Sequence, residues 1–188
     1  MPISERFREA LEYAAALHAD QLRKGSQTPY VAHLLAVTAI VLEHGADEDT
    51  AIAALLHDAV EDQGGAPTRA EIERRFGPRV AAIVDGCTDA DTIPKPPWRE
   101  RKTAYLARLP EADASVHLVI TADKLHNVTS ILRDFRVLGP EIWQRFNGGQ
   151  DGTLWYYRQV ADVLLRTRPG PLVDELHRAV VELERVAG

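Results

Sequence analysis

Helical spacing is the feature of this sequence that most restricts its fold. Apolar residues recur at intervals of three and four along almost the whole chain, and no segment alternates apolar with polar residues as a half-buried strand does. Glycine, proline and capping residues divide this pattern into segments. The helices predicted in this way span residues 5–22, 32–43, 50–61, 69–76, 79–85, 99–109, 114–136, 140–146, 153–166 and 171–186. The chain is therefore predicted to be all-α, a bundle of about eight to ten helices.

Local signals refine these boundaries. Asp47 or Asp49 is expected to cap the third helix, and Thr68 with Glu71 fits a capping box at the start of the fourth. The segment 88–98 contains three prolines and is expected to be an ordered loop. The capping residues should fix where the third and fourth helices begin, and the prolines should interrupt the helical pattern.

Length and charge narrow the classes of protein that remain. A chain of 188 residues suits one domain, predicted over residues 1–188. The net charge, 22 − 28 = −6, argues against general nucleic-acid binding, and the single Cys87 excludes an internal disulfide or a cysteine-based zinc cluster. The N-terminus lacks the apolar core of a signal peptide, and no apolar run approaches the roughly 18 residues of a membrane span. A cytoplasmic protein with no membrane partner is expected.

Ionisable residues are most concentrated in the segment 57–62, His-Asp-Ala-Val-Glu-Asp, which follows an apolar run. On a continuous helix, His57 and Glu61 would share one face, and Asp58 and Asp62 the next. Four ionisable groups at the end of a buried helix are costly unless they serve a purpose such as metal binding. The alternative is an ordinary solvated helix terminus.

Two further residues strengthen the metal hypothesis. His33 opens the second long helix, and Asp123 lies within a long, mostly apolar one. Taken singly, the histidine fits a cap or core position and the aspartate fits a salt bridge. Together with His57 and Asp58 they form a set of two imidazoles and two carboxylates. Mixed nitrogen and oxygen donors of this kind suit Mn²⁺, Fe²⁺ or Zn²⁺ and leave room for water or substrate.

The same motifs carry a resemblance to a known family. In chain order they are Arg23-Lys24, the PYVAH segment 29–33, the ALLHDAVED segment 54–62, the DGCT segment 85–88 and the ADKLHN segment 122–127. This arrangement resembles the HD-domain metal phosphohydrolases and, more narrowly, the hydrolase domain of RelA/SpoT proteins. It is most similar to the small stand-alone alarmone hydrolases. The similarity covers about residues 5–165.

The resemblance implies an activity and a set of roles. It implies one Mn²⁺ per chain, and a reaction that removes the 3′-diphosphate of (p)ppGpp as pyrophosphate and leaves GDP or GTP. Many members have proline where this chain has Leu34, and the loop over residues 23–29 varies in length within the family. Because that loop borders the substrate, preference for a guanine or an adenine alarmone stays open. The implied metal ligands are His33, His57, Asp58 and Asp123, and the implied catalytic pair is Glu61 and Asp62.

Candidate substrate contacts are cationic, polar and aromatic. Arg23 and Lys24 precede His33 closely enough to reach a diphosphate at the metal, although two solvated loop cations are the alternative. Lys102 matches a family position near the substrate, but a charged run such as 99–102 is often a solvated helix face.

Further along the chain, Asn127 lies one turn beyond Asp123 and is a candidate to hydrogen-bond the sugar or phosphate. Tyr156 belongs to an aromatic cluster that could stack on a base or pack in the core. Lys124 and His126 are expected to be structural or rim residues on other faces of that helix.

Several functions are compatible with these features. The leading hypothesis is a Mn²⁺-dependent (p)ppGpp 3′-pyrophosphohydrolase acting on a small nucleotide. Alternatives are a (p)ppApp hydrolase, a general HD-type nucleotidase or cyclic-nucleotide phosphodiesterase, and a nucleotide sensor without turnover. A purely structural interaction module would leave the set of metal-ligand residues unexplained. The sequence gives no oligomeric state.

Overall fold

The computed structural model describes residues 3–90 and 94–188, so part of the predicted loop 88–98 lies outside the described residues. The all-α prediction is confirmed, because the elements of the described chain are helical apart from an isolated bridge between Leu22 and Pro29. No helix in these two ranges is long and apolar enough to cross a membrane. The α-helices are α1 (Glu5–Leu17), α2 (Val31–Glu43), α3 (Glu48–Leu56), α4 (Ala59–Asp62), α5 (Ala66–Phe76), α6 (Pro78–Cys87), α7 (Trp98–Arg108), α8 (Ala114–Leu138), α9 (Gly149–Thr167) and α10 (Pro171–Ala187), and the 3₁₀ helices are η1 (Leu109–Glu111) and η2 (Gly139–Arg145).

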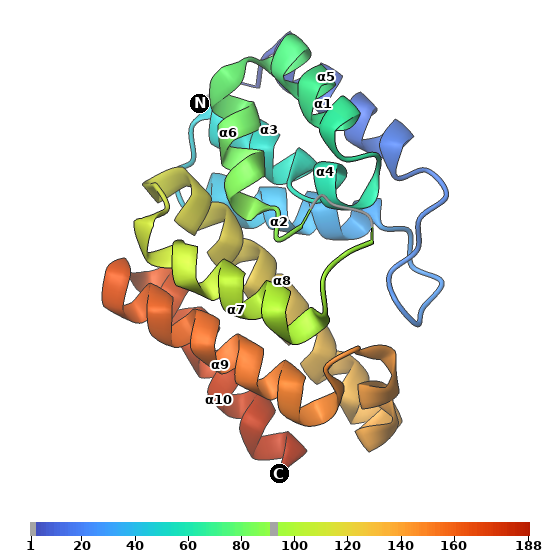
Figure 1. Ribbon diagram of the computed structural model, residues 1–188, viewed down its shortest axis with the longest axis vertical. Coiled ribbons are helices and arrows are strands. Elements are labelled where there is room, and N and C mark those ends of the chain that lie inside the picture. Colours follow the sequence, from blue (N-terminus) through green and yellow to red (C-terminus); the bar gives the residue numbers. More distant parts are fainter. Residues whose placement is uncertain (1–2, 91–93) are drawn as a thin grey trace.

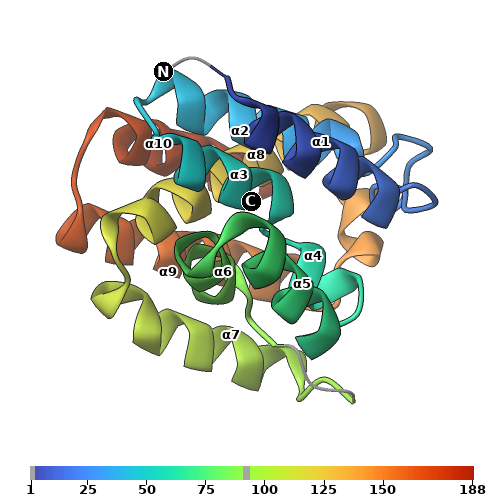
Figure 2. The same cartoon turned by 90° about the horizontal axis from the view of Figure 1, so that it is seen from above.

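The longest helix, α8, joins the two parts of the bundle. It contacts α2, α3 and α6 on one side and α9 and α10 on the other. Figure 1 shows α1 to α6 above α8, with α9 and α10 below it. Figure 2, seen from above, places α1 and α2 along one edge and α7 along the opposite edge. Side chains on α8 can therefore meet groups from both parts of the molecule.

The centre of the core is α3. Every side chain from Ala51 to Leu56 is fully buried, as expected for a helix that is apolar on all sides. It packs against α1, α2, α6 and α8. The residues that follow Leu56 therefore enter the interior of the protein.

The predicted continuous helix over 50–61 is wrong at its most important point. The structure ends α3 at Leu56 and begins α4 at Ala59, so the His57-Asp58 pair forms the junction. The His57 ring explains this break: its Nδ1–H donates to the carbonyl of Ala54 at 2.8 Å and occupies an acceptor near the end of α3. The regular one-turn pairing expected between residues 57 and 61 is therefore lost.

The first helix also ends earlier than predicted, at Leu17 rather than near Leu22. A short loop replaces its last turn. The Tyr30 N–H donates to the Gln21 carbonyl at 2.8 Å, and the Arg23 N–H donates to the Thr28 carbonyl at 2.8 Å. These bonds fold the segment 21–30 back on itself and bring its cations next to the start of α2.

One capping prediction is confirmed and the other is wrong. Asp47 caps α3, where its Oδ1 accepts the Thr50 N–H at 2.9 Å. Thr68 does not cap α5, because that helix already begins at Ala66 after Gly65. The Thr68 hydroxyl instead donates to the Gln63 carbonyl at 2.6 Å. Proline in the first turn sets the start of α5, a position at which its missing N–H costs nothing.

Close packing of α6 against α8 depends on Gly86. A Cβ at this position would lie 2.6 Å from Cγ2 and 2.9 Å from Cγ1 of Val116. Such distances are below normal contact, so any side chain here would push the two helices apart. The packing matters for the site because α6 leads directly into Asp89, described below.

We predict that Gly86→Ala destabilises the protein although alanine is the better helix former by about 1 kcal/mol. Overpacking should cost about 1–3 kcal/mol and exceed that gain. The free energy of unfolding from urea titration measures the difference. Val116→Ala makes room for the added methyl group. The double variant should therefore lose less free energy of unfolding than the sum of the losses in the two single variants. A Gly86→Ala protein as stable as the parent would contradict the packing argument.

Candidate metal centre

Two buried imidazoles face one another at the meeting of α2, α3 and α8. His33 is 1% exposed and His57 is 2% exposed, and the Nε2 atom of each lacks a hydrogen-bond partner. Buried polar atoms are nearly always paired, because leaving one unpaired costs free energy. The two nitrogens therefore mark a position that a further group completes.

Two carboxylates complete the cluster. His33 Nε2 lies 3.2 Å from Asp123 Oδ1 and 3.6 Å from Asp58 Oδ2. His57 Nε2 lies 3.0 Å from Asp58 Oδ2 and 3.7 Å from Asp123 Oδ1. Ligating atoms of His33, His57 and Asp58 all fall within 4.8 Å of one another, and such a group could hold a metal ion. The structure thus brings together all four residues that the sequence singled out for this purpose.

The charges at this centre favour a cation. Burial raises the pKa of Asp58 and Asp123, but neighbouring positive groups outweigh burial and leave both values well below the usual range. The neighbours are His57 for Asp58, and Lys124 followed by both histidines for Asp123. Two charged carboxylates with two imidazole nitrogens form a donor set that fits Mn²⁺, Fe²⁺ or Zn²⁺.

Further contacts hold the carboxylates in place. The Tyr30 hydroxyl donates to Asp58 Oδ2 at 2.5 Å, Lys124 forms an ion pair with Asp123, and the Asn127 amide donates to Asp123 Oδ1. The expectation that Lys124 points elsewhere on the helix is therefore wrong. Its aliphatic stem leads the ammonium group back to the neighbouring carboxylate.

His126 is a second residue whose place the sequence analysis missed. Its Nδ1 lies 2.7 Å from Nδ1 of His33, on the side of that ring away from the carboxylates. Burial, followed by the effect of His33, lowers the pKa of His126 to about 4 and keeps it neutral. A neutral His126 can accept the His33 Nδ1–H, which leaves the His33 Nε2 lone pair free for a metal. Its spacing of three from Asp123 was the available signal, because such residues share a helical face.

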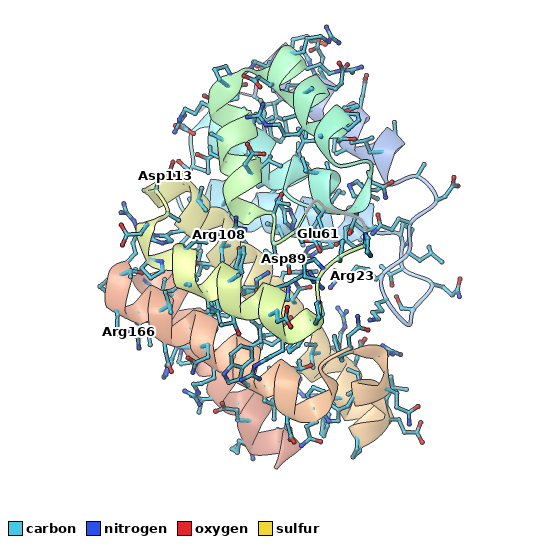
Figure 3. The ribbon with its side chains drawn as sticks, viewed as in Figure 1. Arg23, Glu61, Asp89, Arg108, Asp113 and Arg166 are labelled. Carbon is cyan, nitrogen blue, oxygen red and sulfur yellow. The ribbon has the colours of Figure 1, made fainter. Side chains whose placement is uncertain are left out.

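The predicted acidic pair lies on α4, next to the cluster. The Lys95 ammonium donates to Glu61 at 2.9 Å, and the Gln21 amide donates to Asp62 at 2.9 Å. Burial raises the pKa of both acids, and the negative charge of Asp58 raises them further. Figure 3 labels Glu61 and Arg23 among the side chains of the protein.

An anchored group of cations lies beside Glu61, and the sequence analysis missed its central residue. Asp89 is an acid with a 3% exposed side chain that accepts from Arg101 at 2.5 Å and from Lys102 at 2.5 Å. The charge of Asp89 also contributes to the raised pKa of Glu61. Because Asp89 comes from the proline-rich loop, no periodic pattern marked it. Lys102, by contrast, was predicted near the substrate.

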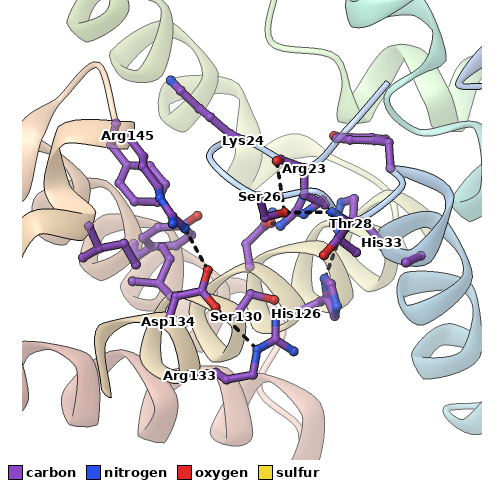
Figure 4. A pocket seen from close by; sticks show the side chains of 17 residues that line it. Arg23, Lys24, Ser26, Thr28, His33, His126, Ser130, Arg133, Asp134 and Arg145 are labelled. Atoms are coloured by element: carbon purple, nitrogen blue, oxygen red, sulfur yellow. Dashed lines mark hydrogen bonds and ion pairs between the residues drawn. The ribbon is translucent and has the colours of Figure 1, made fainter. Parts of the chain in front are cut away.

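Two cavities adjoin the centre. The first cavity, of about 340 Å³, extends from His33 and His126 between α8, η2 and the loop over residues 23–28. The second cavity, of about 260 Å³, lies between α7, α8 and α9. Both are lined by Lys24 and Asn127, which stand at their common border. Figure 4 shows the first cavity from close by.

The predicted substrate contacts divide between the cavities. Arg23 lines the first, where its guanidinium donates to Asn127 at 2.6 Å, and Lys24 reaches Asn147 at 3.3 Å. Lys102 and Tyr156 line the second, with the ammonium 4.7 Å from the ring centroid. Tyr156 is 5% exposed and its buried hydroxyl lacks a hydrogen-bond partner. Its ring thus belongs to the core and also faces a cavity.

Comparisons with known proteins agree with the motifs. The sequence matches the family model described as HD domain over residues 10–154. It is 43% identical over 138 residues to the guanosine-3′,5′-bis(diphosphate) 3′-pyrophosphohydrolase MESH1 of Xenopus tropicalis, and 38% identical over 138 residues to that of Homo sapiens, with 72% of each chain covered in both cases. The predicted family resemblance is therefore confirmed.

Solved structures extend the similarity to the fold. One is the structure of a metazoan ortholog of SpoT that hydrolyzes ppGpp and plays a role in starvation responses. It has a TM-score of 0.78 and 31% identity, and the match covers 100% of this chain and 98% of that one. Another, lmo0812 from Listeria monocytogenes, has a TM-score of 0.71 and 32% identity, with 81% and 99% covered.

We predict that His126→Phe weakens Mn²⁺ binding about 10- to 100-fold, the usual effect of losing the partner that orients a ligating histidine. Phenylalanine keeps a planar ring but cannot accept the His33 proton. Calorimetric titration of the metal-free protein with Mn²⁺ measures the affinity. His44→Phe, at an exposed histidine beyond the end of α2, is the matched control and should bind like the parent. Unchanged affinity in the His126 variant would show that this contact does not prepare the site.

Proposed function

Because the chain belongs to the HD domain family and is a hydrolase, we propose that it removes the 3′-diphosphate of a (p)ppGpp-type nucleotide as pyrophosphate, leaving GDP or GTP. Residues 1–188 would act as one HD-type unit with one Mn²⁺. One observation supports this proposal most strongly: cavities lined by cations adjoin a cluster of two imidazoles and two carboxylates. The names of the relatives support the choice of substrate.

The metal would be held by His33, His57, Asp58 and Asp123. When bound there, a divalent cation lowers the pKa of water and stabilises negative charge on a phosphoryl oxygen. The protein's own contribution at this position is to direct two imidazole nitrogens and two charged carboxylate oxygens at one point. This donor set supports an ion that accepts both nitrogen and oxygen ligands, such as Mn²⁺.

The acidic pair would manage the protons of the reaction. A water oxygen forms a bond to the phosphorus attached to the ribose O3′, and the bond between that phosphorus and O3′ breaks. The water loses a proton, and O3′ gains one as it leaves. Glu61 and Asp62 suit these transfers, because a carboxyl whose pKa is raised by burial can both accept and donate a proton. We do not assign the proton transfer from water to one of these residues and the transfer to O3′ to the other.

The cations would position and neutralise the diphosphate. Arg23 and Lys24 approach from the loop before α2, and Lys102 approaches from α7. Phosphoryl transfer depends mainly on positioning and on charge stabilisation, which such groups supply. Arg23 is already held by Asn127, and Lys102 by Asp89, so little side-chain freedom remains to be lost on binding.

The reaction is tested by product analysis. We expect purified protein with Mn²⁺ to convert ppGpp to pyrophosphate and GDP, separable by anion exchange, and a chelator to stop the conversion. Orthophosphate as the first product would indicate cleavage of a different bond and favour a general nucleotidase. No product from metal-loaded protein that binds ppGpp would favour a nucleotide sensor.

We predict that Glu61→Gln leaves Mn²⁺ binding intact and lowers kcat by at least about 100-fold, the low end of losses for a missing acid-base group. The amide keeps the size of the side chain but cannot take a proton. Saturation kinetics separate this effect from weaker substrate binding. Glu100→Gln, at an exposed acid on α7, is the control and should retain the parental kcat. An unchanged kcat in the Glu61 variant would remove this residue from the mechanism.

A further inference from the structure

The two cavities differ in a way that assigns parts of a nucleotide to them. The described residues lining the second cavity include Arg101, Lys102 and Lys124 but no carboxylate, so that cavity favours phosphate. The first cavity is lined by the cations Arg23, Lys24, Arg133 and Arg145 and also by one carboxylate, Asp134, so it offers an acceptor as well as donors. Its walls also include Ile131 and Ile142, together with Phe146 and Tyr157, which line both cavities. A cavity that combines apolar and aromatic walls with fixed donors and an acceptor suits a nucleobase, and about 340 Å³ is within the usual range of ligand pockets.

Asp134 is held in place on the wall of this cavity by two arginines. Arg145 Nη1 donates to its Oδ2 at 3.0 Å, and Arg133 Nε lies 3.5 Å from its Oδ1. Figure 4 shows both contacts. The Asp134 side chain remains 32% exposed, so its oxygens can still accept further hydrogen bonds.

Arg145 is itself fixed by the loop over residues 23–28. Its guanidinium lies directly against Gly25, at a distance that any Cβ there would prevent. Gly25 also has a φ of +71°, a conformation that favours glycine. A rigid pair of hydrogen-bonding groups, a guanidinium next to a carboxylate, therefore borders the cavity.

This pair matches the edge of guanine. Guanine presents acceptors at O6 and N7, which arginine recognises, and donors at N1–H and the N2 amine, which a carboxylate accepts. Adenine has an amine in place of O6 and an unprotonated N1, so a donor would face arginine and an acceptor would face the carboxylate. We propose that Asp134, paired with Arg145, makes this enzyme selective for guanine over adenine alarmones.

The selectivity rests on the proposed function, and its test separates the two. Rates of hydrolysis of ppGpp and ppApp by the Mn²⁺-loaded full chain give the ratio of their kcat/KM values. We expect ppGpp to be preferred at least about tenfold, in the lower half of the range for one bidentate base contact. Equal rates or a preference for ppApp would overturn the role of Asp134 and leave hydrolysis itself established.

The variant Asp134→Asn tests the residue directly. The amide keeps the shape but places a donor where guanine also donates, so we expect the guanine-to-adenine ratio to fall at least about tenfold, mainly through slower ppGpp hydrolysis. If Asp134 only holds Arg145 and η2, both nucleotides will slow equally and the ratio will not change, which would overturn the inference. Glu141→Gln, at an exposed acid on η2, is the control and should keep the parental ratio.

Binding gives a second measurement that needs no turnover. Calorimetry with GDP and ADP should show at least about tenfold tighter binding of GDP by the parent, and a smaller difference in Asp134→Asn. If neither alarmone is hydrolysed, the proposed function fails while this comparison still decides the base. Equal affinity for GDP and ADP would overturn the inference.

Discussion

The structure depends on keeping two carboxylates charged inside an apolar core. Removing such groups from water costs several kcal/mol each unless opposite charges and hydrogen bonds compensate. Asp58 faces His57 and accepts from Tyr30, and Asp123 pairs with Lys124. All of these partners come from α8, the start of α2 or the junction after α3. The packing of the three helices therefore has to be accurate, and the fully buried residues 51–56 of α3 supply the apolar contacts that hold it.

The charged groups that line the cavities around the centre are also held in place by neighbouring groups. Each cation that would meet the substrate is fixed by a neighbouring acid or amide: Arg101 and Lys102 by Asp89, and Arg23 by Asn127. Groups held in advance lose little freedom when an anion binds, and they stabilise developing charge without having to reorganise. The side chains proposed for phosphate binding and for base recognition are thus fixed by neighbouring groups before any substrate binds.

Much of this was predictable from the sequence, and the failures have physical causes. Periodicity predicted the helices, because their apolar faces are long and regular. It did not predict the break at His57, which depends on a hydrogen bond from the ring to a backbone carbonyl. Thr68 satisfied a capping motif, but Pro67 had already allowed the helix to start. Asp89 and His126 act through contacts with distant segments, and spacing along the chain marks such contacts only weakly.

The most direct test of the account is where a metal binds. A crystal of the Glu61→Gln variant grown with Mn²⁺ and ppGpp, measured at a wavelength where manganese scatters anomalously, locates the ion and the nucleotide together. The account predicts one peak bounded by His33, His57, Asp58 and Asp123, with the base in the first cavity. A peak elsewhere, or none among these four side chains while the parent protein is active with Mn²⁺, would contradict it.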